Sequence, residues 1–244
     1  MLDVEQLTRR YGKLEAVSDL SFQVPAGEIL GLVGPNGAGK TTTLRCLAGI
    51  LPPTEGRIRI GGADLREQPL EAKRLMAFVP DEPRLFEYLT VEEHLAFSAR
   101  LYGVEEPEPR SRRLLEELEL IGKERSLPGE LSRGMKQKLA IACGLLHDPA
   151  VILLDEPLTG LDPVGIRRMK DSIRRRAAAG SCVLVSSHLL GLVEELCHRV
   201  MIIQAGRKVA HGTLQEIKAA LPQLESDASL EAIFLKVTGD GSIA

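Results

Sequence analysis

The chain has 244 residues, of which 44% are hydrophobic, 27% charged and only 3% aromatic. This length and apolar content suffice for one substantial domain, or for a domain with an inserted lobe, and they exclude an intrinsically disordered chain. Lys and Arg total 31 against 34 Asp and Glu, and the resulting net charge of −3 argues against a protein that wraps DNA or RNA.

The sequence also lacks the patterns of a membrane-spanning or secreted chain. Its longest apolar stretches, such as residues 139–146 and 150–154, are far shorter than the roughly 18–20 residues that cross a bilayer. The start of the chain has no apolar run of the kind found in signal peptides. Its four cysteines are far apart, without a Cys-x-x-Cys pair. We therefore expect a soluble protein of the reducing cytosol.

Hydrophobic patterning alternates between strand-like and helix-like periods, which is typical of an α/β layer fold. Before residue 85 we expect one helix at residues 41–50 and short strands at residues 2–7, 20–24, 28–33, 57–60 and 77–79. After residue 145 we expect strands at 150–155 and 182–187, a helix between them at 163–179, a hairpin formed by 200–203 and 208–210, and short helices at 214–221 and 230–237.

The middle of the chain has helical patterning. Thr90 and Glu93 fit a capping box, which predicts a helix from there to about residue 102. After a proline-rich break at 105–109 we expect a second helix at 111–121, and a third begins near Ser132. We interpret residues 85–145 as a helical lobe inserted into an α/β core. The predicted divisions are a core of residues 1–84 and 146–212, the lobe at 85–145 and a helical tail at 213–244.

A glycine-rich segment after the expected strand at 28–33 satisfies the pattern G-x-x-x-x-G-K-[ST]. Glycines allow successive backbone N–H groups to point at an anion, and the helix that follows adds its positive N-terminus. Lys40 would reach the β- and γ-phosphates of a nucleotide, and the Thr41 hydroxyl would ligate Mg²⁺. The predicted phosphate loop consists of Gly34, Pro35, Asn36, Gly37, Ala38, Gly39, Lys40 and Thr41.

Two carboxylates, Asp155 and Glu156, follow the apolar strand expected at 150–155. The carboxyl ends of strands are where a doubly wound sheet presents its ligand groups. Asp155 would hold Mg²⁺, and Glu156 would polarise the attacking water as a general base. Two adjacent carboxylates beside a phosphate loop therefore favour nucleotide hydrolysis over a simple nucleotide switch.

GTPases and kinases are the alternative phosphate-loop proteins. The sequence has no Asn/Thr-Lys-x-Asp stretch for reading guanine. Residues 162–165 match the GTPase pattern D-x-x-G, but so short a pattern is weak evidence. A kinase has no need of Glu156. Neither alternative accounts for a further motif that lies between the two sites.

That motif resembles the signature of a known family. Leu131-Ser132-Arg133-Gly134-Met135-Lys136-Gln137 is similar to the Leu-Ser-Gly-Gly-Gln signature of ATP-binding cassette (ABC) proteins, and Ser132 lies 23 positions before Asp155. Other motifs of that family occur in the same order along essentially the whole chain. The resemblance implies a P-loop NTPase α/β core with a small N-terminal antiparallel β subdomain and an inserted α-helical subdomain.

The resemblance also assigns roles near the start of the chain. It implies that Tyr11 stacks on adenine and that Thr42 extends the phosphate loop. Asp81 stands where the family's glutamine loop has Gln. Because stacking discriminates weakly between bases, the choice of ATP over GTP rests on the resemblance alone.

Further roles follow in the second half of the chain. Asp162, in Gly160-Leu161-Asp162, matches the family's D-loop, and His188, which lies 33 positions after Asp155, matches the switch histidine. The implied catalytic residues are Glu156, His188 and Asp81, and the implied metal ligands are Thr41, Asp155 and Asp81.

In this family two cassettes pair head to tail, so that each ATP lies between the phosphate loop of one and the signature of the other. The resemblance therefore implies ATP and Mg²⁺ as cofactors, and a second cassette whose nucleotide meets Ser132, Arg133, Gly134 and Met135. It implies transmembrane permease subunits as partners, a position on the cytoplasmic face of the cell membrane, and no nucleic acid. Residues 229–239 resemble the tail of ABC-2-type subunits of drug or antibiotic export.

Three residues depart from the family pattern. Arg133 replaces the first signature glycine, Met135 replaces the glutamine, and Asp81 replaces the glutamine that senses the transmembrane partner. These departures keep open a regulatory cassette with low turnover. A soluble ABC ATPase that acts on nucleic acid or ribosomes is the other alternative, although the chain lacks long coiled-coil insertions and a second cassette.

Two groups of residues have no role in these motifs. His94, His147, His198 and His211 are interpreted as structural or surface residues. A basic cluster on the helix expected at 163–179 predicts a solvated helix surface, with contact to anionic lipid headgroups or a partner as the alternative. The cluster consists of Arg167, Arg168, Lys170, Arg174, Arg175 and Arg176.

Overall fold

Two β-sheets organise the part of the chain that this computed structural model describes, residues 1–221 and 228–239. The smaller sheet is antiparallel with the order β2-β1-β4-β5. It contains β1 (Leu2–Tyr11), β2 (Leu14–Val24), β4 (Glu55–Ile60) and β5 (Ala63–Asp64). The larger sheet has the order β10-β9-β3-β8-β7-β6 and is parallel except for β10. It contains β3 (Ile29–Val33), β6 (Met76–Val79), β7 (Val151–Asp155), β8 (Cys182–Ser186), β9 (Arg199–Gln204) and β10 (Arg207–Gly212).

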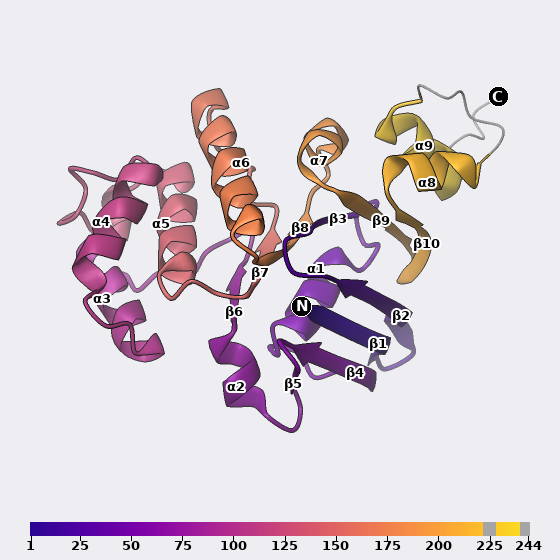
Figure 1. Ribbon diagram of the computed structural model, residues 1–244, viewed down its shortest axis with the longest axis horizontal. Coiled ribbons are helices and arrows are strands. Elements are labelled where there is room, and N and C mark those ends of the chain that lie inside the picture. Colours follow the sequence, from indigo (N-terminus) through magenta and orange to yellow (C-terminus); the bar gives the residue numbers. More distant parts are fainter. Residues whose placement is uncertain (222–227, 240–244) are drawn as a thin grey trace.

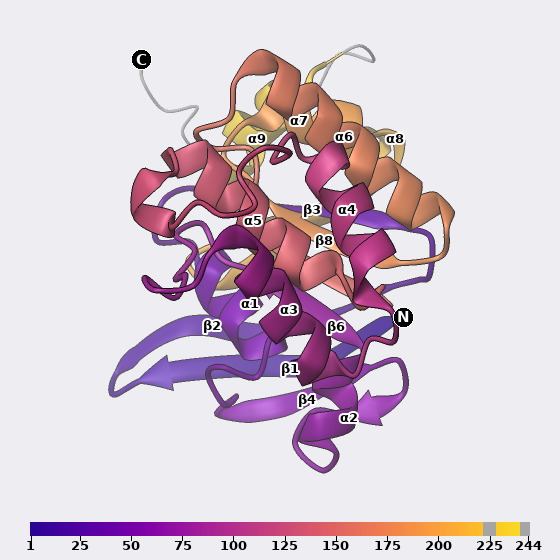
Figure 2. The same cartoon turned by 90° about the vertical axis from the view of Figure 1, so that its left-hand side faces the viewer.

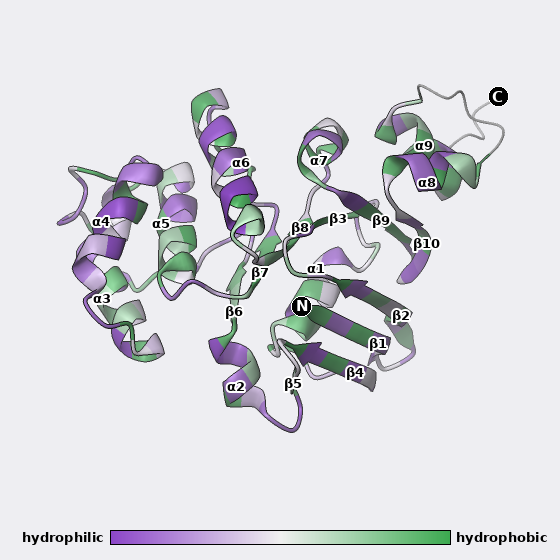
Figure 3. Cartoon of the chain, viewed as in Figure 1, coloured by the Kyte–Doolittle hydropathy of each residue, from purple (hydrophilic) through white to green (hydrophobic). Residues whose placement is uncertain are grey.

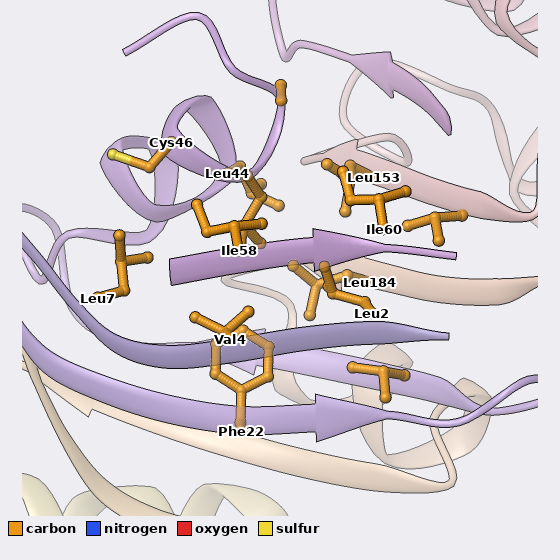
Figure 4. Packing of buried hydrophobic residues seen from close by; sticks show 14 of the residues in the cluster. Leu2, Val4, Leu7, Phe22, Leu44, Cys46, Ile58, Ile60, Leu153 and Leu184 are labelled. Carbon is orange, nitrogen blue, oxygen red and sulfur yellow. The ribbon is translucent and has the colours of Figure 1, made fainter. Parts of the chain in front are cut away.

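Helix α1 (Lys40–Leu47) lies between the two sheets (Figure 1). Its buried face contributes Leu44 and Leu47 to one hydrophobic cluster that includes residues of both sheets. Figure 4 shows Leu44 near Ile58 of β4 and Leu153 of β7. Burying a leucine side chain contributes about 1.5–3 kcal/mol, so this packing fixes the direction of α1 and the place of its N-terminus.

A second hydrophobic cluster covers the opposite face of the larger sheet. There α6 (Pro163–Ala178) packs with α5 (Arg133–Leu145), and α3 (Val91–Tyr102) and α4 (Pro107–Glu117) lie farther from the sheet. Figure 2 shows these helices in front of the strands. The 3₁₀ turn η1 (Pro128–Glu130) leads into α5. Since the signature motif begins α5, this packing determines where the motif lies.

A third cluster packs helices beyond β9. It joins Val200 and Ile202 of β9 to α7 (Leu190–Leu196), α8 (Leu214–Ala219) and α9 (Leu230–Thr238). The two helices predicted in the tail are thus present, within a few residues of their predicted bounds. Parts of the predicted tail, residues 222–227 and 240–244, lie outside the described residues.

Local sequence signals correctly predicted several ends of elements. Thr90 and Glu93 form the predicted capping box of α3, and Ser132 is the N-cap of α5, where its hydroxyl accepts a bond from the Met135 N–H. The predicted hairpin is β9 and β10, which pair antiparallel. These features are local because each is formed by residues only a few positions apart.

Other bounds differ from the prediction, and each difference has a local cause. The proline-rich break was wrong because α4 begins at Pro107; a proline in the first turn of a helix loses no hydrogen bond there. Strands β1 and β2 are longer than predicted, since irregular pairing, with Gln6 and Asp19 at positive φ, interrupts their alternation. The short helices α2 (Pro69–Arg74) and α7 have too few turns to show a period.

Most residues of the basic cluster on α6 form ion pairs with carboxylates of the same chain. Arg176 and Arg175 form ion pairs with Glu117 at the end of α4, at 2.7 and 3.0 Å. Burial raises the pKa of Glu117, but hydrogen bonds from Arg176 and Ser172 outweigh this and leave the pKa below its usual value. Arg168, Lys170 and Arg174 form further ion pairs with Glu119 and Glu195. Figure 3 shows the hydrophilic colouring along much of α6. The side chains of Arg168, Arg174 and Arg175 remain 43–60% exposed, so the helix surface is solvated, as predicted, and its charges are also paired with neighbouring carboxylates.

Two of the histidines without a motif have structural partners. The buried His94 accepts a hydrogen bond from the Phe86 N–H, and Nδ1 of His198 accepts one from the Ile29 N–H. The four cysteines are free, and burial raises the pKa of Cys46, Cys143 and Cys182 to about 11. Among the described residues, no helix combines the length and apolar content needed to cross a membrane.

Candidate nucleotide-binding site

The predicted phosphate loop connects β3, which is buried throughout, to α1. Two of its glycines are required by their surroundings. A Cβ atom on Gly34 would lie 2.4 Å from the carbonyl oxygen of Ile203, and one on Gly39 would lie 2.4 Å from that of Ala16. Gly39 also has a φ of +104°, which side chains disfavour. The loop is therefore held against β9 and β2 in a shape that only glycine permits at these positions.

Lys40 lies at the start of α1 and is partly buried. Its Nζ donates hydrogen bonds to the carbonyl oxygens of Gly34, at 2.6 Å, and Pro35, at 3.2 Å. Burial lowers the pKa of Lys40, and the negative charges of Glu156 and Asp155 oppose this shift only in part. The fold thus brings Lys40, the predicted phosphate-binding residue, close enough to Asp155 and Glu156 for their charges to act on it.

Asp155 and Glu156 leave the end of β7 beside Ser186, the last residue of β8. The Ser186 hydroxyl donates to Oδ1 of Asp155 at 2.6 Å and accepts from the backbone N–H of Glu156 at 3.1 Å. Ser186 is fully buried and Asp155 is nearly so. This hydroxyl therefore orients both carboxylate residues. The sequence analysis did not identify Ser186; its only signal was its place at the end of a predicted buried strand.

Glu156 and His188 are hydrogen-bonded. Oε2 of Glu156 lies 2.8 Å from Nδ1 of His188 and accepts a second bond from the His188 backbone N–H at 3.3 Å. Glu156 has a φ of +50°, an uncommon conformation that costs about 1–3 kcal/mol and that its surroundings must maintain. The two residues lie 32 positions apart, and the adjacency of β7 and β8 brings them together.

We expect Ser186→Ala to lower the free energy of unfolding by about 1–3 kcal/mol, because it leaves a buried Asp155 oxygen without its donor. Urea unfolding followed by circular dichroism would measure this. Ser187→Ala is the matched control, since within the described residues that similarly buried hydroxyl has one hydrogen bond, which it accepts from the Leu189 N–H, and none with Asp155. Equal losses in the two variants would contradict the orienting role of Ser186.

The residues predicted to hold Mg²⁺ have suitable chemistry. The ion prefers oxygen ligands, and Asp155 supplies a carboxylate and Thr41 a hydroxyl at the same edge of the larger sheet. The Ser186 bond engages only Oδ1 of Asp155, so the other carboxylate oxygen has no bond within the described residues. Asp155 and Thr41 therefore fit the ion, which would keep several waters as its other ligands.

Tyr11 ends β1, and its side chain is only partly covered, with 44% of the residue exposed. The guanidinium of Arg9 lies 4.7 Å from the centre of the Tyr11 ring. A cation over the face of a ring is attracted by its π electrons, so the Arg9 guanidinium helps to orient the Tyr11 ring. The predicted role of Tyr11 as a platform for adenine remains a prediction.

The signature residues lie at the N-terminus of α5, in the helical part of the molecule (Figure 1). A Cβ on Gly134 would lie 2.8 Å from the carbonyl oxygen of Gly160, so these two segments are in close contact. Asp162, the predicted D-loop residue, is the N-cap of α6 and accepts from the Gly165 N–H at 2.8 Å.

Asp81 and Arg133 form an ion pair. Their side chains approach to 3.3 Å between Oδ1 and a guanidinium nitrogen. The sequence analysis treated the two as separate departures from a family pattern and did not expect them to meet. The predicted contact of Asp81 with Mg²⁺ or water stays a prediction.

Comparison with known proteins decides the family. The sequence model of the family described as ABC transporter matches residues 17–159, which is more than half of the chain. The chain belongs to the ABC transporter family. The matched region contains the phosphate loop, the signature residues and the Asp155–Glu156 pair.

Individual relatives of this ABC cassette agree with the family model. It is 35% identical over 240 residues to the ABC-type transporter ATP-binding protein EcsA of Bacillus subtilis, with 98% of this chain and 96% of that protein covered. It is 41% identical over 213 residues to the Nod factor export ATP-binding protein I of Burkholderia pseudomallei, covering 86% of this chain and 70% of that protein. A solved ATP-binding subunit of an ABC transporter superposes with a TM-score of 0.93 at 37% identity, covering 98% of this chain and 99% of the other.

The fold of the ABC cassette thus brings together the phosphate loop, Asp155, Glu156 and His188, as the motifs predicted. The ABC fold prediction, an α/β core with an antiparallel β subdomain and helical parts, is confirmed. Ser132, Gly134 and Met135 belong instead to the start of α5. The phosphate loop and the start of α5 are thus formed by different segments of the chain.

Proposed function

We propose that this ABC cassette hydrolyses ATP to drive export through separate membrane-spanning subunits, to which it binds on the cytoplasmic face of the membrane. The observation that carries the proposal is the Glu156–His188 pair beside Asp155 and Lys40, because a carboxylate held near this lysine suits a general base for a water that attacks a terminal phosphate. The names of two relatives support the transport role: one is an ABC-type transporter ATP-binding protein and the other a Nod factor export ATP-binding protein.

In the proposed reaction the phosphate loop holds ATP by its backbone N–H groups and by Lys40, and Tyr11 stacks on the adenine. Asp155 and Thr41 hold Mg²⁺, which neutralises charge on the β- and γ-phosphates when it is bound. A water oxygen attacks the γ-phosphorus while the bond to the β-phosphate oxygen breaks, and ADP leaves. Glu156 accepts the proton of the water as general base, and its bond to His188 keeps the carboxylate in place.

The start of α5 serves as a second half-site, which requires a partner cassette. In the proposed pair of cassettes, the signature residues Ser132, Gly134 and Met135 of one copy contact the γ-phosphate held by the other. A helix N-terminus with its backbone N–H groups suits an anion, which favours this role for the start of α5. Hydrolysis would remove the bridging phosphoryl group, so the pair separates after each turnover.

The experiment that tests the transport role is recovery of the tagged protein from membranes of its own cells, followed by an ATPase assay. We expect it to co-purify with integral membrane subunits of about six spanning helices, and the recovered assembly to hydrolyse ATP. Wild-type protein without the tag is the control for adventitious capture. Recovery with ribosomes or nucleic acid and without such subunits would contradict the proposal, as would an assembly without ATP turnover.

A further inference from the structure

Two contacts tie the signature helix to the segment that follows β6. The first is the Asp81–Arg133 ion pair, with 3.3 Å between its atoms. The second is a hydrogen bond of 3.3 Å from the Gln137 amide nitrogen to the carbonyl oxygen of Pro80. Arg133 and Gln137 are four positions apart on α5 and so lie on one face of the helix. That face therefore contacts two consecutive residues, Pro80 and Asp81.

The two contacts differ in burial. Gln137 is 2% exposed, and its Oε1 has no hydrogen-bond partner within the described residues. The Asp81 and Arg133 side chains are 42% and 61% exposed. Breaking an exposed ion pair has a small cost, because water solvates both groups again. The Gln137 contact is thus a fixed anchor, while the Asp81–Arg133 ion pair can open without unfolding its surroundings.

Arg133 also contacts the segment after β7. A Cβ on Gly160 would lie 3.6–3.8 Å from atoms of the Arg133 side chain, so this side chain lies directly beside the path of the chain toward Asp162. In the part of the chain that the structure describes, Asp81 is the acidic partner of Arg133. The guanidinium belongs to the first residue of α5, where the helix N-terminus adds a positive field. A phosphate oxygen would suit this cation as well as the carboxylate does.

We propose that Asp81 is a positioning residue that acts through Arg133. In the single cassette Asp81 binds the guanidinium, and in the paired cassettes Arg133 releases Asp81 and binds the terminal phosphate held by the other copy. This inference rests on the proposed pairing of two cassettes around ATP. It gives Asp81 and Arg133, which both depart from the family pattern, a shared role. Asp81 competes with the phosphate for Arg133 and so sets the ATP concentration at which the two cassettes pair.

The test uses the full chain with Glu156→Gln, which is expected to slow hydrolysis, and measures the dimer fraction against Mg-ATP concentration by light scattering. Asp81→Asn should lower the ATP concentration for half-maximal pairing about two- to fivefold for each site, since it removes the competitor of the phosphate. Arg133→Gln should raise that concentration about tenfold, because the phosphate loses a cation. In the Arg133→Gln background, Asp81→Asn should have no further effect.

Two controls accompany the series. Asp148→Asn removes the carboxylate of another exposed ion pair, which Asp148 forms with Arg110 at 2.8 Å, and it should leave the pairing curve unchanged. Asp81→Glu retains the charge and should stay close to the unmodified protein. Melting curves of each variant establish that it folds. The effect of Asp81→Asn should also shrink at high salt, since salt screens an exposed ion pair.

Each outcome has a distinct meaning. Weaker pairing in both single variants would overturn the inference, since it indicates a structural contact or a metal-ligand role for Asp81. If Asp81→Asn strengthened pairing equally with and without Arg133, the inference would also be overturned, because the carboxylate would then repel the nucleotide directly. If the Glu156→Gln protein alone does not pair at saturating ATP, the proposed pairing fails before the role of Asp81 is reached.

Discussion

Lys40→Ala is expected to weaken ATP binding by at least about 100-fold and to abolish measurable turnover. The ammonium group would make charge-assisted hydrogen bonds to the β- and γ-phosphates, and no other basic side chain of the phosphate loop could replace it. The partial burial of Lys40 strengthens the expectation, because an interaction between charges is stronger in a site partly shielded from water than in bulk water. Titration with a fluorescent ATP analogue and a phosphate-release assay would measure the two effects.

The matched control for this variant is Lys123→Ala, which removes an exposed lysine far from the phosphate loop in sequence. It should retain the nucleotide affinity and turnover of the unmodified protein. Thermal unfolding should show that Lys40→Ala remains folded, since in the part of the chain that the structure describes Nζ bonds only the loop's own carbonyl oxygens. A folded Lys40→Ala protein with unchanged ATP affinity would contradict the assignment of the phosphate loop.

Glu156→Gln is expected to lower the rate of ATP turnover by about 10²–10⁴-fold, the usual contribution of a general base. The amide has nearly the same shape and can still accept the hydrogen bond from His188, but it cannot take a proton from water. Because the ATP would then persist, a nucleotide-bound dimer should accumulate. Single-turnover hydrolysis and light scattering would measure these two results.

The control for that variant is Glu116→Gln, which changes the same chemical group in an exposed ion pair with Arg112 on α4. Its turnover should equal that of the unmodified protein. Undiminished turnover in Glu156→Gln would remove Glu156 as the base. Loss of turnover without an ATP-bound dimer would leave the base in place and contradict the proposed pairing.

Much of the site could be predicted because its signals are local. The glycines of the phosphate loop, the Lys40 that follows them and the strand before them lie within a dozen residues. The Thr90 capping box and the Ser132 N-cap are of the same kind, since the residues that bond are neighbours in sequence. The structure has each of them where the sequence predicted.

Contacts between distant segments could not be predicted in the same way. Ser186 meets Asp155 because β8 lies beside β7, and spacing along the chain does not encode which strands pair. The Asp81–Arg133 ion pair spans 52 positions and depends on the packing of α5 beside β6. The lengths of β1 and β2 could not be predicted either. The irregular pairing near Gln6 and Asp19 interrupts the alternation of buried and exposed residues from which strand length is predicted.

The sequence by itself determined the chemistry that this ABC cassette carries: a phosphate loop, two carboxylates after an apolar strand, and a signature helix. Glycine conformations, helix caps and hydrophobic periods act over a few residues, so a linear pattern specifies them. Only the tertiary structure decided which of these groups touch. Burial of apolar faces fixes the order of strands and helices, and that order brings Glu156 to His188, Ser186 to Asp155, and Asp81 to Arg133.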